Sequence, residues 1–171
     1  MKKRPIDINE NAETILKTLN KGAFLTSRSE DKVNTMMIGW GHIGRIWERP
    51  VFIAYVRDCR YTSELLDKIP EFTVNIPLSK VDKETFLACG RKSGRDIDKI
   101  QECGLTLVPP EVISVPAIKE FPLTLECRVI YREPQDASRL PEEIRKQFYS
   151  IETSEHIVYY GEIVAAYMVE E

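Results

Sequence analysis

The stretch from Asn34 to Asn75 constrains the fold of this chain more than any other part of the sequence. Three strand-like runs lie along it, at residues 33–40, 51–57 and 71–76, and the last alternates with period two. The middle run is β-branched and aromatic and follows Pro50, which is typical of a central strand. Gly39, Gly41 and Gly44 interrupt the first run, and glycine weakens a strand unless a backbone or ligand must approach closely. The stretch therefore predicts a β wall that can admit a flat ligand.

The rest of the chain adds strands and short helices around this wall. Apolar spacing, caps and turn residues predict further strands at 22–28, 105–108, 123–132 and 156–169, and helices at 12–19, 64–68, 83–88, 97–102 and 141–148. Asn11 and Asp82 are the expected caps of the first and third helices, and Gly161 is expected to mark a bulge. We therefore expect a mainly β protein with short helices, of the α+β class, in one domain spanning residues 1–171.

Composition excludes several classes of protein. The formal net charge of −3 argues against nucleic-acid binding, and no apolar run approaches the ~20 residues of a membrane span. The opening Met-Lys-Lys-Arg has no apolar run behind it, so we expect a cytoplasmic protein without a signal peptide. The four cysteines are scattered and are expected to be free thiols, and with only two histidines we expect no zinc site.

A basic turn follows the central strand. Arg57 and Arg60 come just before Thr62 and Ser63, either of which is a natural N-cap for the helix that follows. A helix N-terminus offers free N–H groups and a partial positive charge, so two arginines beside it would suit a phosphate. An ordinary capped helix with two solvated arginines fits the spacing equally well.

Other residues in these segments also allow two interpretations. Trp40 would stack on an aromatic ligand or fill the core, and the neighbouring methionines are typical gap-fillers. Asn75 would face inward and bond a ligand's amide-like edge, or face outward near a strand end. The glycine-rich basic loop at residues 89–96 would close over an anion through Ser93, or remain a solvated loop.

The order of these elements resembles the flavin reductase-like, FMN-binding split-barrel family, which includes flavoredoxin-type proteins. The resemblance covers about residues 22–168. The residues that carry it are Asn34 to Gly41, Pro50-Val51, Arg60-Tyr61-Thr62, Phe72 to Asn75, Ser93 to Asp96 with Asp98-Lys99, and His156 with Gly161-Glu162.

This resemblance implies a six-stranded antiparallel split barrel that forms a homodimer and holds FMN in a groove near the subunit boundary. The segment 34–40 would run along the flavin ring, the segment 57–62 would hold the phosphate, and the loop 89–96 would approach the cofactor. On this basis the expected FMN contacts are Asn34, Thr35, Met36, Met37, Ile38, Trp40, Arg57, Arg60, Tyr61, Thr62, Asn75 and Ser93. His156 is a candidate neighbour of the flavin or substrate and the candidate catalytic residue.

The implied activity is NAD(P)H-dependent reduction of flavin, ferric iron or another small acceptor. Hydride transfer to a flavin needs no acid–base pair, and the sequence shows no Ser-His-Asp or paired-carboxylate pattern. It also lacks a Rossmann GxGxxG, so a nicotinamide would bind transiently over the flavin. Alternatives are a flavoredoxin-like electron carrier reduced by a protein partner, a split barrel that has lost its cofactor, and a relative that binds pyridoxal phosphate or haem in the same barrel.

Overall fold

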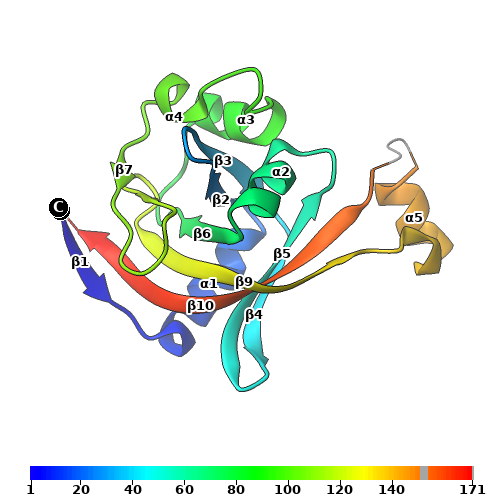
Figure 1. Ribbon diagram of the computed structural model, residues 1–171, viewed down its shortest axis with the longest axis horizontal. Coiled ribbons are helices and arrows are strands. Elements are labelled where there is room, and N and C mark those ends of the chain that lie inside the picture. The colour runs from blue at the N-terminus through cyan, green and yellow to red at the C-terminus, as the bar shows by residue number, and fades with distance from the viewer. Residues whose placement is uncertain (151–153, 171) are drawn as a thin grey trace.

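A curved antiparallel sheet forms the body of the protein (Figure 1). The computed structural model describes residues 1–150 and 154–170. The main sheet has the order β3-β2-β6-β9-β10-β5-β4, with β1 paired to β10, and a second sheet joins β7 to β8. The strands are β1 (Lys2–Pro5), β2 (Ala23–Arg28), β3 (Val33–Ile38), β4 (Gly41–Ile46), β5 (Arg49–Arg57), β6 (Glu71–Ile76), β7 (Leu107–Val108), β8 (Ala117–Ile118), β9 (Leu123–Pro134) and β10 (His156–Glu170).

Short helices cover parts of this sheet (Figure 1). They are α1 (Ile8–Leu19), α2 (Tyr61–Lys68), α3 (Lys83–Arg91), α4 (Lys99–Glu102) and α5 (Glu142–Phe148), with a 3₁₀ turn η1 at Ala137–Arg139. The predicted α+β class is confirmed, although the main sheet has eight strands where six were expected. None of the helices in the described part of the chain is long and apolar enough to cross a bilayer.

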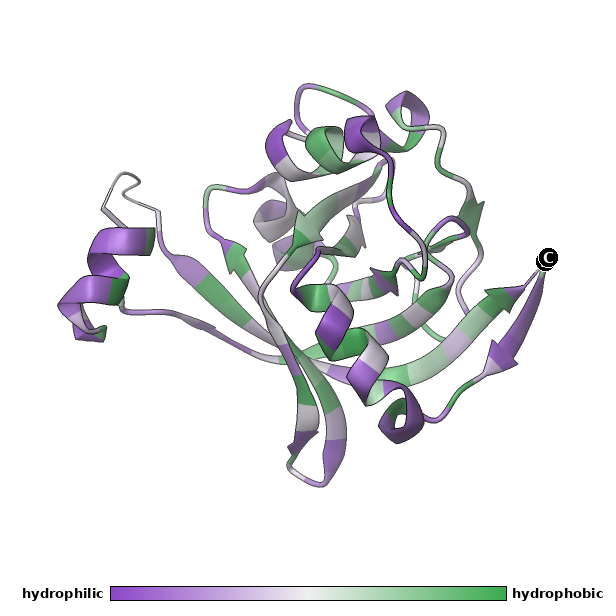
Figure 2. Ribbon diagram, turned by 180° about the vertical axis from the view of Figure 1, so that it is seen from behind, coloured by the Kyte–Doolittle hydropathy of each residue, from purple (hydrophilic) through white to green (hydrophobic). Residues whose placement is uncertain are grey.

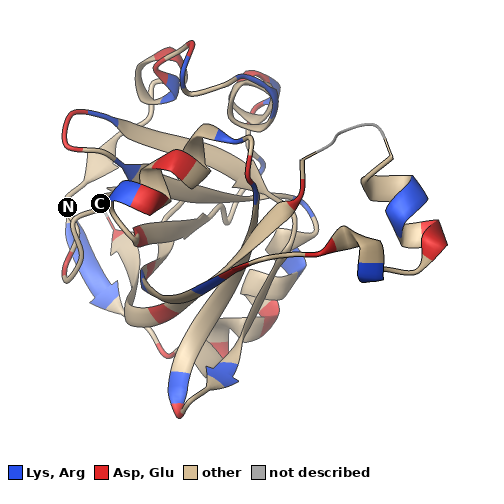
Figure 3. Cartoon of the chain, turned by 45° about the vertical axis from the view of Figure 1, so that its right-hand side comes forward, with Lys and Arg blue, Asp and Glu red and all other residues tan. Residues whose placement is uncertain are grey.

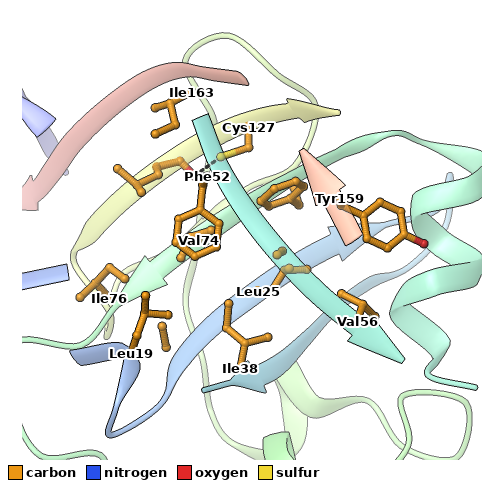
Figure 4. Packing of buried hydrophobic residues seen from close by; sticks show 14 of the residues in the cluster. Leu19, Leu25, Ile38, Phe52, Val56, Val74, Ile76, Cys127, Tyr159 and Ile163 are labelled. Carbon is orange, nitrogen blue, oxygen red and sulfur yellow. Dashed lines mark hydrogen bonds between the residues drawn. The ribbon is translucent and has the colours of Figure 1, made fainter. Parts of the chain in front are cut away.

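The main core lies inside the curve of the sheet, where side chains from opposite strands meet (Figure 4). Leu25, Phe52 and Val74 are fully buried there, and each such side chain contributes about 1.5–3 kcal/mol to stability. Figure 2 shows the hydrophobic residues as green segments along the strands. The core therefore fixes which face of each strand points outward to ligands.

Helix α1 closes one end of this core with Ile15 and Leu19. The predicted start at Asn11 is wrong: the helix begins at Ile8 because the Asp7 side chain accepts a hydrogen bond from Asn9 N at 2.7 Å. It ends as predicted before Gly22, whose φ of +110° is a left-handed conformation that favours glycine.

Strand β4 was not predicted, because its glycines weaken the strand pattern. Gly41 pairs with Ala54, and a Cβ there would lie 2.7 Å from Phe52 Cζ, so the glycine makes room for a core aromatic ring. Trp47 and Glu48 both have positive φ and close a tight two-residue hairpin to β5.

The connection between β9 and β10 carries η1 and α5 away from the sheet, and we call its described residues, 135–150 and 154–155, the arm (Figure 1). The predicted bulge is confirmed, because the register between β9 and β10 shifts at Tyr160/Gly161. Basic and acidic residues are interspersed over the body and the arm (Figure 3), which matches the small net charge.

Candidate functional site

A cavity of about 140 Å³ lies where β3 passes the start of α2, the end of α3 and the start of α4. We call it the basic cavity. Its lining includes the cations Arg60, Lys92, Arg95 and Lys99, and no described residue of the lining carries a carboxylate. The full lining is Asn34, Met36, Cys59, Arg60, Tyr61, Thr62, Cys89, Gly90, Lys92, Ser93, Gly94, Arg95 and Lys99.

Two of the four cations are neutralised by partners outside the cavity. Lys92 forms an ion pair with Glu102, and Arg95 forms one with Glu64. Among the described residues no carboxylate pairs with Arg60 or Lys99. The cavity therefore carries an excess of positive charge directed at its interior.

Lys99 is the most unusual of these groups because its side chain is buried, with 4% of the residue exposed. Its Nζ donates to the carbonyl of Cys89 at 3.2 Å, which leaves ammonium hydrogens for another acceptor. Burial lowers the pKa of Lys99, and the nearby charges of Arg60 and Lys32 lower it further. A buried cation without a carboxylate partner is costly, and an anion in the cavity would compensate it.

The N-terminus of α2 opens into the same cavity. The prediction of Thr62 or Ser63 as its N-cap is wrong, because the helix begins at Tyr61 and Arg60 occupies the cap position without a side-chain hydrogen bond. Thr62 Oγ1 instead accepts from Asn34 Nδ2 at 3.1 Å. Ser63 N donates to the Arg60 carbonyl at 3.0 Å, but among the described residues no side chain accepts from the N–H groups of Tyr61 or Thr62. Anions bind at such helix starts.

The loop after α3 closes the cavity from the other side. A Cβ on Gly94 would lie 2.0 Å from Asn34 Oδ1, so only glycine allows this approach. Lys32 Nζ donates to the Gly94 carbonyl, and Arg95 Nη1 donates to the Cys59 carbonyl at 3.1 Å. These contacts hold the loop beside β3 and the start of α2.

A second cavity, of about 220 Å³, adjoins the first and shares Met36 and Arg60 with it. We call it the aromatic cavity. It is wider and more open to solvent, and the end of β3 forms one wall while β5, α5 and β10 form the others. Its lining is Met36, Met37, Ile38, Gly39, Trp40, Tyr55, Arg57, Arg60, Phe148 and His156.

Aromatic rings from distant segments meet in this second cavity. The Trp40 ring lies 5.2 Å from Phe148 in an edge-on arrangement and 4.9 Å from the His156 ring. His156 is 7% exposed, and its Nδ1 lies 2.8 Å from the Tyr149 hydroxyl. Trp40 is 42% exposed, so the prediction that it only fills the core is wrong. The cavity can therefore take a flat aromatic group.

Arg57 does not reach the basic cavity, contrary to its predicted phosphate-binding role. Its Nη2 donates to the carbonyl of Phe148 at 2.7 Å, and its Nη1 donates to the carbonyl of Ser154 at 2.9 Å. Both acceptors lie on the arm. Arg57 therefore holds the arm beside the aromatic cavity.

Thr35 and Asn75, two further predicted contacts, are fully buried and line neither cavity. Asn75 Nδ2 lies 3.0 Å from both Thr26 Oγ1 and Thr73 Oγ1, and its Oδ1 accepts from Ile118 N at 3.0 Å. Thr35 Oγ1 lies 3.1 Å from Thr26 Oγ1. These groups satisfy one another between strands. Asn75 faces inward, as one of its two interpretations expected, but its hydrogen-bond partners are protein groups, and the outward interpretation is wrong.

The two cavities gather the other predicted residues. Asn34, Met36, Arg60, Tyr61, Thr62 and Ser93 line the basic cavity, and Met36, Met37, Ile38, Trp40, Arg57, Arg60 and His156 line the aromatic one. Lys99, Gly94, Tyr55 and Phe148 line the site but were missed. Gly94 and Lys99 lie in the segments Ser93 to Asp96 and Asp98-Lys99 that carry the family resemblance, whereas Tyr55 and Phe148 gave no signal in the sequence.

The cysteines are free thiols, as predicted. Cys59 is exposed at the rim of the basic cavity, whereas burial raises the pKa of Cys89 to about 12. Cys89 is therefore protonated at neutral pH and unreactive as a nucleophile. Within residues 1–150 and 154–170, no cluster of three or more His, Cys, Asp or Glu side chains could hold a metal.

Comparisons with known proteins agree on one family. A family model described as a flavin reductase-like domain matches residues 20–171. An uncharacterised protein of Archaeoglobus fulgidus is 32% identical over 105 residues, covering 61% of this chain and 49% of the relative, so the chain spans about half the length of that curated relative. The flavoredoxin of Desulfovibrio vulgaris (Miyazaki F) superposes with a TM-score of 0.67 at 25% identity, covering 87% of this chain and 69% of that one. The flavoredoxin of Methanosarcina acetivorans also gives 0.67, at 29% identity over 87% of this chain and 68% of that one.

Proposed function

The chain belongs to the flavin reductase-like family, with its split-barrel fold, and we propose that it binds FMN and acts as an NAD(P)H-dependent oxidoreductase that reduces flavin, ferric iron or another small acceptor. The observation that carries this proposal is the pair of adjoining cavities, one small and cationic and the other wider and aromatic, joined at Met36 and Arg60. A phosphate and a flat ring connected by a short polar chain match this pair in charge and shape. We further propose that residues 1–171 form one such domain.

The donor set of the basic cavity fits a phosphate. Arg60 and the buried Lys99 supply charge, the start of α2 supplies backbone N–H groups, and Ser93 supplies a hydroxyl. Charge-assisted hydrogen bonds of this kind are about twice as strong as neutral ones. The phosphate of FMN would therefore be held here, and its charge would offset the cost of burying Lys99.

The aromatic cavity would hold the flavin ring against the end of β3. When bound, FMN supplies the redox chemistry, accepting a hydride and passing electrons on singly or in pairs. Met36 to Trp40 would position the ring, and Phe148 and Trp40 would limit water at its edge. The hydrogen bond between Tyr149 and His156 fixes the imidazole orientation beside the ring, where His156 would contact flavin or substrate.

A second candidate function is an electron carrier that a protein partner reduces. The two flavoredoxins favour it, because they resemble this chain over 87% of its length. Anaerobic titration with NADH and NADPH separates the two functions. Rapid bleaching of the bound flavin supports the reductase, and an unchanged spectrum supports the carrier.

The first test is the visible absorption spectrum of the purified protein with added FMN. Flavin bands that shift on binding support the proposal, and no binding in excess FMN refutes it and with it the proposed roles of both cavities. Arg60→Ala should weaken FMN binding by about 10- to 100-fold, the usual worth of a charge-assisted contact. Full affinity in that variant would contradict the assignment of the basic cavity.

We also propose that the protein forms a homodimer through the outer face of β5, β9 and β10. Trp47, Tyr131 and Tyr160 form a cluster there, with the two tyrosine rings 5.2 Å apart. Trp47 is 56% exposed and Tyr131 42% exposed, and gathered exposed aromatic rings are typical of interfaces. Light scattering that gives the mass of one chain would refute the dimer.

A further inference from the structure

The loop at residues 92–96, between α3 and α4, forms one wall of the basic cavity, because Lys92 to Arg95 all belong to its lining. We call it the cavity loop. Its backbone packs closely on its neighbours, since a Cβ on Gly94 would lie 2.0 Å from Asn34 Oδ1 and 2.9 Å from Tyr61 Cδ1. The position of this loop therefore decides how wide the cavity is on that side.

Tyr61, the first residue of α2, lies at the centre of the contacts that hold the cavity loop. Lys32 Nζ lies 5.5 Å from the centre of the Tyr61 ring, and the Arg95 guanidinium carbon lies 5.6 Å from it. Both distances are within the ~6 Å at which an aromatic ring attracts a cation. Lys32 also donates to the Gly94 carbonyl, so one side chain connects the middle of the loop to α2.

Arg95 fastens the end of the cavity loop to the same helix. Its Nε donates to Glu64 Oε1 at 3.2 Å, and its Nη1 donates to the Cys59 carbonyl at 3.1 Å. The side chains of Arg95 and Glu64 are 41% and 52% exposed, and exposed ion pairs are weak. The loop is therefore held by contacts that can break and re-form without unfolding the barrel.

Two of the holding residues can be changed without touching the cavity. Its described lining contains neither Lys32 nor Glu64, so either residue acts on a ligand only through the loop or through its charge. The two charges are opposite in sign, while their effect on the loop is the same. This difference separates a mechanical role from an electrostatic one.

We propose that Lys32 and Glu64 are positioning residues that hold the cavity loop closed, and that opening of this loop sets the rates at which FMN enters and leaves the basic cavity. This inference rests on the proposed function, because it assigns a gate to the same phosphate site. The holding contacts join protein groups to one another, so weakening them lets the loop open more often in both directions of exchange. The gate thereby decides whether FMN stays bound between turnovers or exchanges with free FMN.

The first experiment measures FMN entry by stopped-flow fluorescence and FMN release after dilution. Glu64→Gln and Lys32→Met should each raise both rates about two- to fivefold, which corresponds to the loss of one exposed contact. Charge alone predicts other signs, because removal of Glu64 would slow the release of an anion and removal of Lys32 would slow its entry. The matched control is Glu13→Gln, which breaks the exposed ion pair with Lys17 on α1 and should change neither rate. Rates that follow the charge, a faster release with unchanged entry, or an equal change in the control would overturn the proposal.

The second experiment measures loop opening without FMN, by the rate of trypsin cleavage after Arg95. The Arg95 side chain must leave Glu64 to enter the protease, so cleavage reports the open population of the loop. Lys32→Met should speed this cleavage although Lys32 contacts Gly94 and Tyr61, because the loop moves as a unit. Inorganic phosphate is the probe for the cavity and should slow the cleavage of the wild type.

The two experiments separate the gate from the proposed function. If FMN does not bind, the proposed function fails, and the cleavage rates alone support or overturn the gate. Unchanged cleavage in Lys32→Met, or no protection by phosphate, would overturn it.

Discussion

Replacing the buried Lys99 with methionine should affect the FMN complex and the free protein in opposite directions. Methionine has a similar length and removes the charge while filling the space under α3. Lys99 is 4% exposed, and its only protein acceptor in the described structure is the carbonyl of Cys89. In the free protein the variant should be as stable as the wild type or more stable, because a buried charge without a carboxylate partner is removed.

The affinity for FMN should fall. A hydrogen bond to a charged group is worth roughly 1.5–3 kcal/mol, which corresponds to about 10- to 150-fold in the dissociation constant. Lys92→Met is the comparison variant. Lys92 lines the same cavity but is paired with Glu102, so its removal should cost less affinity.

The pH dependence provides a second signature. The pKa of Lys99 lies below the usual 10.5 of lysine because of burial. Between these two values the unfolded chain binds more protons than the folded protein, so the stability of the free wild type should rise with pH in that window. The affinity of the wild type for FMN should fall over the same window, because the ammonium loses its proton. Lys99→Met should show neither change.

Titration of FMN fluorescence and thermal melting with and without FMN measure these effects. The reasoning is refuted if Lys99→Met binds FMN within threefold of the wild type. It is also refuted if the free variant is markedly less stable, because Lys99 would then be a structural residue that does not serve the anion.

Three further substitutions test the site and its support. Gly94→Ala should weaken FMN binding and lower the free energy of unfolding by about 1–3 kcal/mol, because its Cβ would lie 2.0 Å from Asn34 Oδ1. Gly44→Ala is the control, since a Cβ there meets no atom within 4 Å, and it should be nearly neutral in denaturant melts. Glu126→Gln should destabilise the protein by about 3 kcal/mol in urea unfolding, since the buried carboxylate accepts three backbone N–H groups and a tyrosine hydroxyl; a change under 1 kcal/mol would contradict this account. Tyr149→Phe should slow flavin reduction in stopped flow without changing FMN affinity, because it removes one hydrogen bond that orients the His156 ring. An unchanged rate would show that this hydrogen bond is unimportant.

Local signals in the sequence were sufficient for much of the fold. Asp82 caps α3 as predicted, and Gly161 marks the shift in register, because caps and bulges depend on neighbouring residues. Strand β4 was missed because Gly41 and Gly44 lower strand propensity, while its pairing with β5 decides the structure.

The site shows the limit of the same reasoning. Arg57 was assigned to a phosphate because it precedes a helix, but its partners lie on the arm, about ninety residues away in sequence. Asn75 accepts a hydrogen bond from the backbone of Ile118 in β8, a contact that no local pattern reveals. The burial of Lys99 also depends on how α4 packs against the rest of the chain. Such tertiary partners decide whether a polar residue is free for a ligand.

The position of β10 has a consequence for how the protein is made. This strand is the last one in the chain, yet it lies in the middle of the sheet between β9 and β5. Among the described strands, β5 pairs only with β4 and β10, so the β4–β5 hairpin has no sheet connection to β9 until β10 has left the ribosome. Such late, long-range pairing is slow and leaves strand edges open. A nascent chain that ends at Pro134 should therefore need chaperones. Such a chain also lacks His156 and the arm, which complete the aromatic cavity, so the protein should bind its cofactor only after β10 has been synthesised.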